Sequence, residues 1–290
     1  MALYGWRLSR NRVLVVKVTK MKYVFFIGIA ILMSCCKADG INFESMESSE
    51  MDFNKRQGKE LVAFMSLETM FPNRQVRALA EAAGQGNLKK VESLITQGVD
   101  VNSRGTKNAT PLFWAMRNID GFEKLLELGA DPNIVFADSS VMHWAARHEN
   151  VSFLRMALIH GGNPDLVVGK LGETPIFKTI GVTGSGNRIA MIILLESGAN
   201  IDATTGGGEV FGMSMAGKTP IMTAADLGRF DIVYDLLSRG ANYDSEDDSG
   251  RDLMDRVVSM NGRYVAGSEQ ERSLEIVIEW LNDHGVYLPQ

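Results

Sequence analysis

The stretch from Thr110 to Asn133 reads TPLFWAMRNIDGFEKLLELGADPN and contains two short phrases that recur along the chain. Copies of its closing phrase begin at Gly98, Gly129, Gly161, Gly198 and Gly240, with a worn sixth copy at Gly285. These glycines are separated by 31, 32, 37, 42 and 45 residues. Self-similarity with a period in this range is typical of a solenoid built from stacked units.

The opening phrase of the same stretch follows each closing phrase by about ten residues. Its copies are Thr110-Pro111-Leu112, Ser140-Val141-Met142-His143, Thr174-Pro175-Ile176 and Thr219-Pro220-Ile221. A hydroxyl residue followed by proline favours the start of a helix, because the hydroxyl can accept from an unpaired amide and proline is tolerated at the first helical position. Small residues follow, so we expect this first helix to pack closely on its neighbours. They are Ala115, Ala145, Ala146, Ala224 and Ala225.

Apolar residues at helical spacing precede each closing glycine, as at Leu88, Val91 and Leu94. The spacing predicts a second helix in each unit, which the glycine ends in a left-handed conformation.

Together the phrases resemble the ankyrin repeat, whose pattern runs G-x-T-P-L-H-x-A-A and then V-x-x-L-L-x-x-G-A-D-x-N. The resemblance implies an all-α ankyrin-repeat solenoid of about six helix-turn-helix repeats with projecting hairpin loops, which we place at residues 74–290. The first copy lacks Thr-Pro and the last, from Ser249 to Val286, has Asp252-Leu253 in its place. Both are expected to be caps.

The segment from Met21, MKYVFFIGIAILMSCC, has the charge and order of a secretory signal. Its apolar run, Tyr23 to Met33, is 11 residues long, and a membrane-spanning helix needs about 20. We therefore predict an export signal at residues 1–34, with translation starting at Met21 and residues 1–20 as an untranslated extension.

The four residues that end at Cys35, Leu-Met-Ser-Cys, resemble the bacterial lipobox. This resemblance implies that Cys35 is lipidated and that residues 35–73 form a polar tether. In a Gram-negative source, the absence of Asp after Cys35 would favour the outer membrane, with the folded part in the periplasm. A plain signal peptide with leftover cysteines is the alternative.

The charge of the chain disfavours nucleic acid as a partner. No acidic residue precedes Cys35, and the chain from there on has 24 basic and 35 acidic residues, a net charge of −11. Such a body repels phosphate backbones and favours a basic protein surface. The two cysteines, Cys35 and Cys36, are adjacent, which excludes a disulfide framework or a cysteine-based zinc site in the rest of the chain.

Two motifs suggest chemistry, but neither fits its expected context. Residues 212–219, GMSMAGKT, match the nucleotide-binding P-loop pattern, yet no buried strand precedes them and Gly217-Lys218-Thr219 already belongs to a repeat phrase. Ser214 lacks the strand and the final glycine of a nucleophile elbow.

The four histidines, His143, His148, His160 and His284, form no catalytic or metal-binding pattern. In the ankyrin pattern the position of His143 implies a hydrogen bond between adjacent loops. We therefore predict a non-enzymatic protein with no catalytic residue, metal or cofactor.

Candidate partner-binding residues follow from their places in the repeat. Trp114 and Trp144 occupy the same position in successive copies, where the resemblance implies either anchors in a concave groove or filling of the core between repeats. Loop-tip candidates are Phe136, Asp138, Lys170, Val210 and Phe211. The last two lie in a Gly-rich finger, because 18 residues separate Asn200 from Thr219 where other copies have eight to ten. Long loops on a rigid scaffold commonly carry binding, although insertion drift explains the finger equally well.

The lipobox, the tether and the repeat phrases are similar to those of ankyrin lipoproteins found beside phospholipase toxins of type VI secretion. That similarity implies an immunity protein that binds the toxin at the membrane through an acidic groove and inhibits it. The alternative is a periplasmic ankyrin scaffold that supports an envelope or oxidative-stress enzyme.

Overall fold

The computed structural model describes residues 65–181, 186–210, 213–214 and 216–289. The predicted export signal and Cys35 lie outside these residues.

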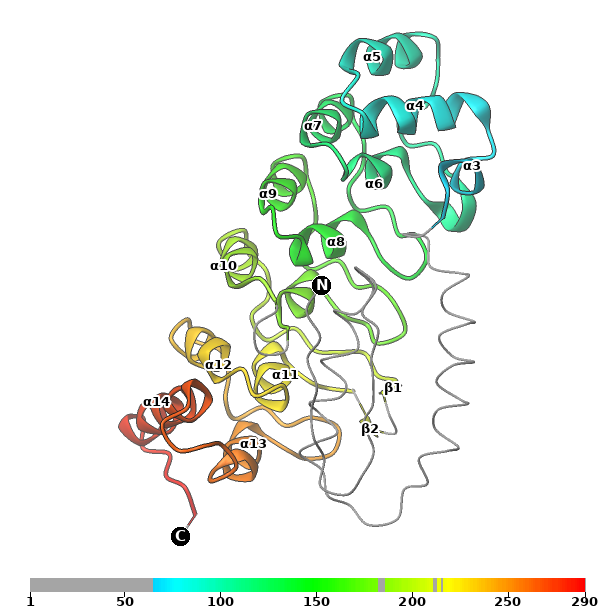
Figure 1. The fold of residues 1–290 in the computed structure, drawn as a ribbon. Helices are drawn as coiled ribbons and strands as arrows, with labels where there is room; N and C mark the ends of the chain where they lie inside the picture. The colour runs from blue at the N-terminus through cyan, green and yellow to red at the C-terminus, as the bar shows by residue number, and fades with distance from the viewer. Residues whose placement is uncertain (1–64, 182–185, 211–212, 215, 290) are drawn as a thin grey trace, which may run out of the picture. The chain divides into compact units, whose positions relative to one another are not determined.

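Six consecutive helix pairs make up the described chain (Figure 1). They are α4 (Arg74–Gly84) with α5 (Leu88–Thr96), α6 (Pro111–Ala115) with α7 (Ile119–Glu127), α8 (Val141–Arg147) with α9 (Ser152–Ile159), η3 (Pro175–Thr179) with α10 (Arg188–Glu196), α11 (Pro220–Asp226) with α12 (Phe230–Leu237), and α13 (Leu253–Met260) with α14 (Glu269–Asp283). The all-α prediction and the number of repeats are confirmed. In the fourth pair the first helix is a 3₁₀ helix.

The helices lie in two layers (Figure 1). The first helix of each pair lies in one layer, which we call the first-helix layer, and the second helix lies in the other. Successive first helices contact each other, as α4 does α6 and α8 does η3, so each repeat buries its neighbour.

The repeat phrases begin and end these helices in the way that the sequence predicts. Thr110 and Ser140 accept hydrogen bonds from the amides of Phe113 and His143, which caps α6 and α8. The glycines of all six closing phrases have positive φ, between 81° and 91°. Only glycine adopts that conformation without strain, which explains why it recurs after every second helix.

Short loops join each second helix to the next first helix. They carry η2 (Thr106–Asn108), antiparallel bridges between Phe136 and Ser139 and between Val168 and Glu173, and the finger, in which β1 (Glu209–Val210) pairs with β2 (Met213–Ser214). Glu209 pairs with Ser214 and Val210 with Met213. The predicted hairpin loops are therefore present, and the finger is one of them.

Close packing between repeats rests on small residues. The alanines of the opening phrases are fully buried. Gly121 in α7 is still closer to its neighbour, because a Cβ added to it would lie 1.8 Å from the backbone oxygen of Ala83 in α4. Large apolar side chains such as Phe122 and Leu125 fill the space between the layers, each contributing about 1.5–3 kcal/mol.

The packed body begins before the repeat pattern does. A short helix, α3 (Leu67–Met70), contacts α4, and Met70 and Phe71 have no exposed surface. Residues that the sequence placed at the end of the polar tether therefore belong to the packed body.

Candidate protein-binding surface

Trp114 and Trp144 lie in equivalent places on the first-helix layer, in α6 and α8, and both are partly exposed. Trp114 packs edge-on against Phe71, with 6.5 Å between ring centroids. The indole of Trp144 lies 5.4 Å from the ring of Phe113. Each tryptophan therefore fills part of the core between repeats and leaves part of its surface exposed, and its role as a partner anchor stays a prediction.

An arginine lies over each of these indoles. The guanidinium carbon of Arg117 is 3.6 Å from the ring centroid of Trp114, and that of Arg147 is 5.1 Å from the ring centroid of Trp144. Both arginines come three residues after their tryptophan: Arg147 is the last residue of α8, one helical turn from Trp144, and Arg117 lies in the turn just after α6. We call the four residues the Trp–Arg ladder.

Arg117 lies in the turn that follows α6 and is bonded to the last turn of that helix. One of its terminal nitrogens donates to the backbone oxygen of Trp114 at 3.0 Å. Burial lowers the pKa of Arg117, because the guanidinium is partly removed from water. Sequence reasoning did not select the arginines, although their repeated spacing after the tryptophans is visible in the sequence.

Two loop-tip candidates, Asp138 and Lys170, are exposed on neighbouring loops. The prediction for Phe136 is wrong, since only 2% of its surface is exposed. Its ring packs 4.4 Å from that of Phe113, centroid to centroid, so it anchors the loop.

The finger contains the remaining two candidates. Val210 lies in β1, but its side chain and the whole of Phe211 are outside the described residues. Backbone hydrogen bonds hold the base of the finger. The amide of Thr205 donates to the oxygen of Lys218, and the amide of Gly217 donates to the oxygen of Thr205. The amide of Gly206 donates to the oxygen of Leu171 in the preceding loop.

Backbone strain marks the tips of two loops. Lys107 and Asn108, and likewise Ala137 and Asp138, are non-glycine residues with positive φ, between 44° and 69°. The amide of Ala137 donates to the backbone oxygen of Lys107 at 3.2 Å, so the two strained tips are bonded to each other. Such strain is often found in binding loops.

The histidines have structural surroundings. His143 is buried, its Nδ1 is paired with the hydroxyl of Ser140 at 2.8 Å, and its Nε2 is paired with the backbone oxygen of Glu173 at 3.1 Å. It therefore connects α8 to the next loop, as the resemblance implied. Burial lowers its pKa to about 4, with a smaller contribution from Lys178. In the described chain there is no group of three or more His, Cys, Asp or Glu residues suited to a metal ion.

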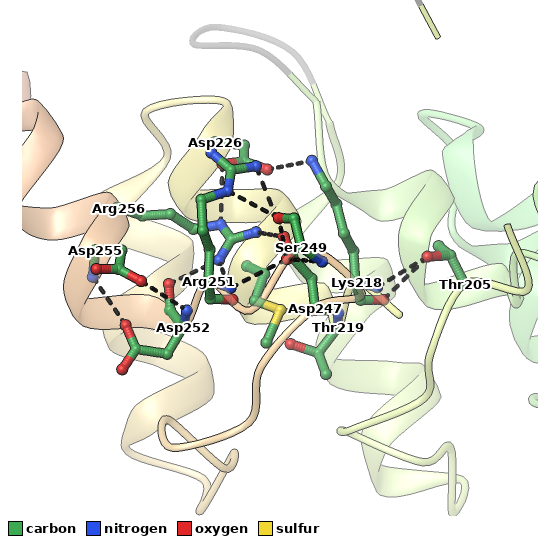
Figure 2. Close-up of polar contacts among 11 residues, drawn as sticks. Thr205, Lys218, Thr219, Asp226, Asp247, Ser249, Arg251, Asp252, Asp255 and Arg256 are labelled. Atoms are coloured by element: carbon green, nitrogen blue, oxygen red, sulfur yellow. Dashed lines mark hydrogen bonds and ion pairs between the residues drawn. The ribbon is translucent and has the colours of Figure 1, made fainter. Parts of the chain in front are cut away.

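Lys218, the lysine of the P-loop-like motif, is buried in an ionic cluster (Figure 2). Its Nζ lies 2.6 Å from a carboxylate oxygen of Asp226, whose other oxygen accepts from Nε of Arg256 at 3.0 Å. Arg256 also pairs with Asp247, and all of these except Asp226 are at least nine-tenths buried. We call these four residues the buried ionic cluster.

The cluster has two cations and two anions, so it is balanced within itself. Burial by itself would raise the pKa of Asp247, but hydrogen bonds from Ser249, Arg251 and Arg256 hold it well below its usual range. Lys218 thus pairs with Asp226 inside the fifth repeat, and Arg256 joins this pair to the last repeat, so the lysine of the motif is buried in a structural ion pair.

No helix of the described residues is both long enough and apolar enough to cross a membrane.

Comparison with known proteins gives a consistent result. A family model of ankyrin repeats, in three copies, matches residues 142–247. The Protein PhlB of Serratia liquefaciens is 31% identical over 106 residues, which are 36% of this chain and 46% of that protein. Palmitoyltransferase AKR1 of Lachancea kluyveri is 26% identical over 191 residues, 64% of this chain and 25% of that protein. The chain therefore spans less than half the length of either relative.

Among solved structures, a chain from the complex of the Bd0816 predatory endopeptidase of Bdellovibrio bacteriovorus with immunity protein Bd3460 has a TM-score of 0.53 at 20% identity. The alignment covers 69% of this chain and 97% of that chain, and at this identity it shows the fold alone. The repeated phrases, the six helix pairs and these matches agree: the described chain is a stack of ankyrin repeats, and a family model recognises three of them.

Proposed function

We propose that this chain is a non-enzymatic ankyrin lipoprotein of the bacterial envelope that binds and inhibits a type VI secretion phospholipase effector, and so acts as an immunity protein. The Trp–Arg ladder carries the protein-binding part of this proposal. Two partly exposed indoles at equivalent positions of adjacent repeats offer a large contact area at low entropic cost, as binding hot spots do.

Inhibition follows from occupation of a surface. The loop tips at 107–108 and 137–138 belong to the same repeats as the ladder, and an effector held against both would have its substrate entrance covered. Such a mechanism needs no chemistry from the inhibitor, which agrees with histidines and a lysine that are used in packing.

The envelope location and the identity of the effector rest on the sequence. The lipobox-like residues before Cys35 support lipidation, and the resemblance to ankyrin lipoproteins beside phospholipase toxins supports the immunity role. A membrane-held inhibitor would meet an incoming phospholipase where its substrate lies.

The function is tested by capture and inhibition. The mature chain from Cys35 is used to capture proteins from detergent-solubilised envelopes, and a recovered phospholipase is assayed with increasing amounts of the chain. We expect stoichiometric loss of lipase activity. Replacing either Trp114 or Trp144 by leucine should weaken inhibition about 30-fold, because each residue is a hot-spot candidate of about 2 kcal/mol.

The matched control is Tyr234→Leu, which alters a half-exposed aromatic residue in the second-helix layer. It should leave inhibition unchanged, and thermal unfolding should show that all variants are folded. Recovery of resident envelope proteins alone would contradict the immunity role and favour a periplasmic scaffold that supports an envelope enzyme.

Lipidation has its own test. Cells that express the chain are grown with radiolabelled palmitate, and the envelope fraction is examined for labelled protein. Cys35→Ser should abolish the label and Cys36→Ser should retain it. Equal labelling of the two variants would contradict lipidation at Cys35.

A further inference from the structure

We propose that the partner presents an acidic segment to the Trp–Arg ladder, with carboxylates placed beside apolar side chains. This inference rests on the proposed function only in taking the partner to be a protein. It proposes that the ladder recognises negative charge. The net charge of the chain, by contrast, favours a basic partner.

The first observation is that the two arginines are not neutralised. In the part of the chain that the structure describes, neither Arg117 nor Arg147 has a carboxylate oxygen within ion-pair distance, whereas Arg188, Arg229 and Arg256 each pair with an aspartate. An indole face attracts a guanidinium but leaves its full charge. Two unneutralised cations therefore lie one repeat apart on the same layer.

The position of each guanidinium suits a carboxylate ligand. A guanidinium that lies over an indole turns one side towards the ring, while N–H groups at its edge can still donate to a partner. Arg117 uses one terminal nitrogen on the oxygen of Trp114, which leaves Nε and the other terminal nitrogen for a partner. A carboxylate can accept from two such N–H groups at once.

Partial burial strengthens this preference. The pKa of Arg117 is lowered by desolvation, so its charge is poorly compensated in the free protein. A carboxylate that docks there compensates for the lost hydration with charge-assisted hydrogen bonds, and salt screens such a pair less than an exposed one. The apolar side chains next to it would rest on the exposed parts of Trp114 and Trp144.

The surrounding sequence of the layer extends the same sign of charge. The residue of the fourth repeat that corresponds to Trp114 and Trp144 is Lys178, which pairs with Glu173 of the adjacent loop. A basic segment laid along α6, α8 and η3 would therefore meet three cations in a row, of which only the last has an anionic partner. Net charge guides a partner from a distance, but these contacts decide what docks.

The inference is tested with random peptides displayed on phage and selected on the full chain. Peptides that also bind the Arg117→Glu, Arg147→Glu double variant are removed. We expect the survivors to be enriched in Asp and Glu beside aromatic or aliphatic residues. Survivors that are neutral or basic, or a selection in which no peptide distinguishes the two proteins, would overturn the proposal.

The best peptide is then synthesised with a fluorescent label and as a charge-inverted version with lysine at each acidic position. Fluorescence anisotropy should show that the inverted peptide binds at least tenfold more weakly. The double variant should lose a similar factor in its affinity for the original peptide. The reason is that one hydrogen bond to a charged group contributes about a factor of ten or more in affinity. The control variant is Arg155→Glu, which changes an exposed arginine on α9 in the other layer. It should bind the peptide as the wild type does.

Two further arms separate this proposal from its alternatives. Vesicles containing phosphatidylglycerol test a lipid surface, and arginine-dependent binding to them without acidic peptide binding would overturn the inference. A phospholipase inhibited equally by the wild type and the double variant would contradict the acidic-segment proposal while leaving the immunity role in place. Peptide binding without any inhibited effector would contradict the immunity role and leave the acidic-segment proposal in place.

Discussion

Equivalent positions of the repeat have opposite uses in the early repeats and in the fifth repeat. Three residues after the fifth position of the opening phrase, the second and third repeats have Arg117 and Arg147, and the fifth repeat has Asp226. The two arginines lie over indoles and have no carboxylate partner among the described residues, whereas Asp226 is bound by Lys218 and Arg256. Equivalent places in one repeating scaffold thus serve recognition in one region and cohesion in the other.

The difference follows from what each region must join. The early repeats meet neighbours with complementary apolar faces, so their polar groups are free to face outward. The sixth repeat has Asp252-Leu253 in place of Thr-Pro, and its α13 contacts α11 of the fifth repeat through charged groups as well as buried apolar residues. We therefore expect charged pairs to stabilise the region between α11 and α13, and we expect apolar packing to stabilise the region of α6 and α8.

The largest effect is expected from the buried ionic cluster. Arg256→Met keeps much of the side-chain volume but leaves Asp247 and Asp226 without their shared cation, and breaking a buried pair costs about 3–5 kcal/mol. Chemical denaturation should show this loss in the free energy of unfolding.

The control for this substitution is Arg251→Met. Arg251 lies 3.6 Å from the same Asp247 carboxylate, but half of its side chain is exposed, so its pair should contribute less than about 1 kcal/mol. Equal losses from both variants would contradict the role of burial in the cluster.

The second prediction concerns pH and the early repeats. His143 has a pKa of about 4 in the folded chain, against about 6.5 when unfolded, so the unfolded state binds more protons between these values. The stability that His143 provides is complete above pH 6.5 and is lost as the pH falls towards 4. The loss should approach about 3 kcal/mol, because one pKa unit corresponds to about 1.4 kcal/mol.

This slope is measured by denaturation of the wild type and of His143→Gln across that range. The variant should lose much of the pH dependence between pH 4 and 6.5, since glutamine does not titrate. A variant with the same slope as the wild type would show that other groups cause it.

Close packing in the early repeats gives a third, smaller effect. Gly121→Ala places a methyl group against the backbone oxygen of Ala83, and a backbone atom can move only if α4 and α7 separate. Overpacking of this kind costs about 1–3 kcal/mol, which thermal unfolding should detect. The control, Glu123→Ala, changes an exposed residue of the same helix and should alter stability by less than about 0.5 kcal/mol. If Gly121→Ala were as stable as this control, α4 and α7 would not be in the close contact described.

These cases also show which features a sequence can predict. The helix pairs, their caps and the closing glycines depend on neighbouring residues, and the phrases predicted them. The burial of Phe136 depends on its contact with Phe113. The burial of Lys218 depends on its ion pair with Asp226, which also binds Arg256 of the next repeat. Residues far apart in sequence make these contacts, so position within a single repeat did not reveal them.

Gly121 and the arginines of the ladder are intermediate cases. Their spacing is visible in the sequence, but glycine inside a helix usually only weakens it, and an arginine at a helix surface is usually solvated. Only the distances to Ala83 and to the indoles show that each has a specific neighbour. The sequence therefore predicted the two tryptophans of the candidate surface but not its two arginines.

The smallest effect sharpens the comparison at the turns that follow the second helices. In the early repeats, Asn102 and Asn133 accept from the amides of Asp131 and Asn163 and also donate to the oxygens of Gly129 and Gly161. In the later repeats the same places have Asp165 and Asp202. Their carboxylates accept from the amides of Asn200 and Asn242, but when ionised they have no proton to donate to Gly198 and Gly240.

Asp165→Asn should therefore stabilise the chain by about 0.5–1.5 kcal/mol, the contribution of one added hydrogen bond, and Asn133→Asp should destabilise it by a similar amount. Denaturation at neutral pH measures both, with Glu275→Gln, an exposed residue in the middle of α14, as the control for charge alone. Opposite signs for the two exchanges would establish that the early turns are bonded more fully than the later ones. A loss of stability in Asp165→Asn would instead mean that the carboxylate is the better partner for the amide of Asn200, and that the later turns are already at their optimum.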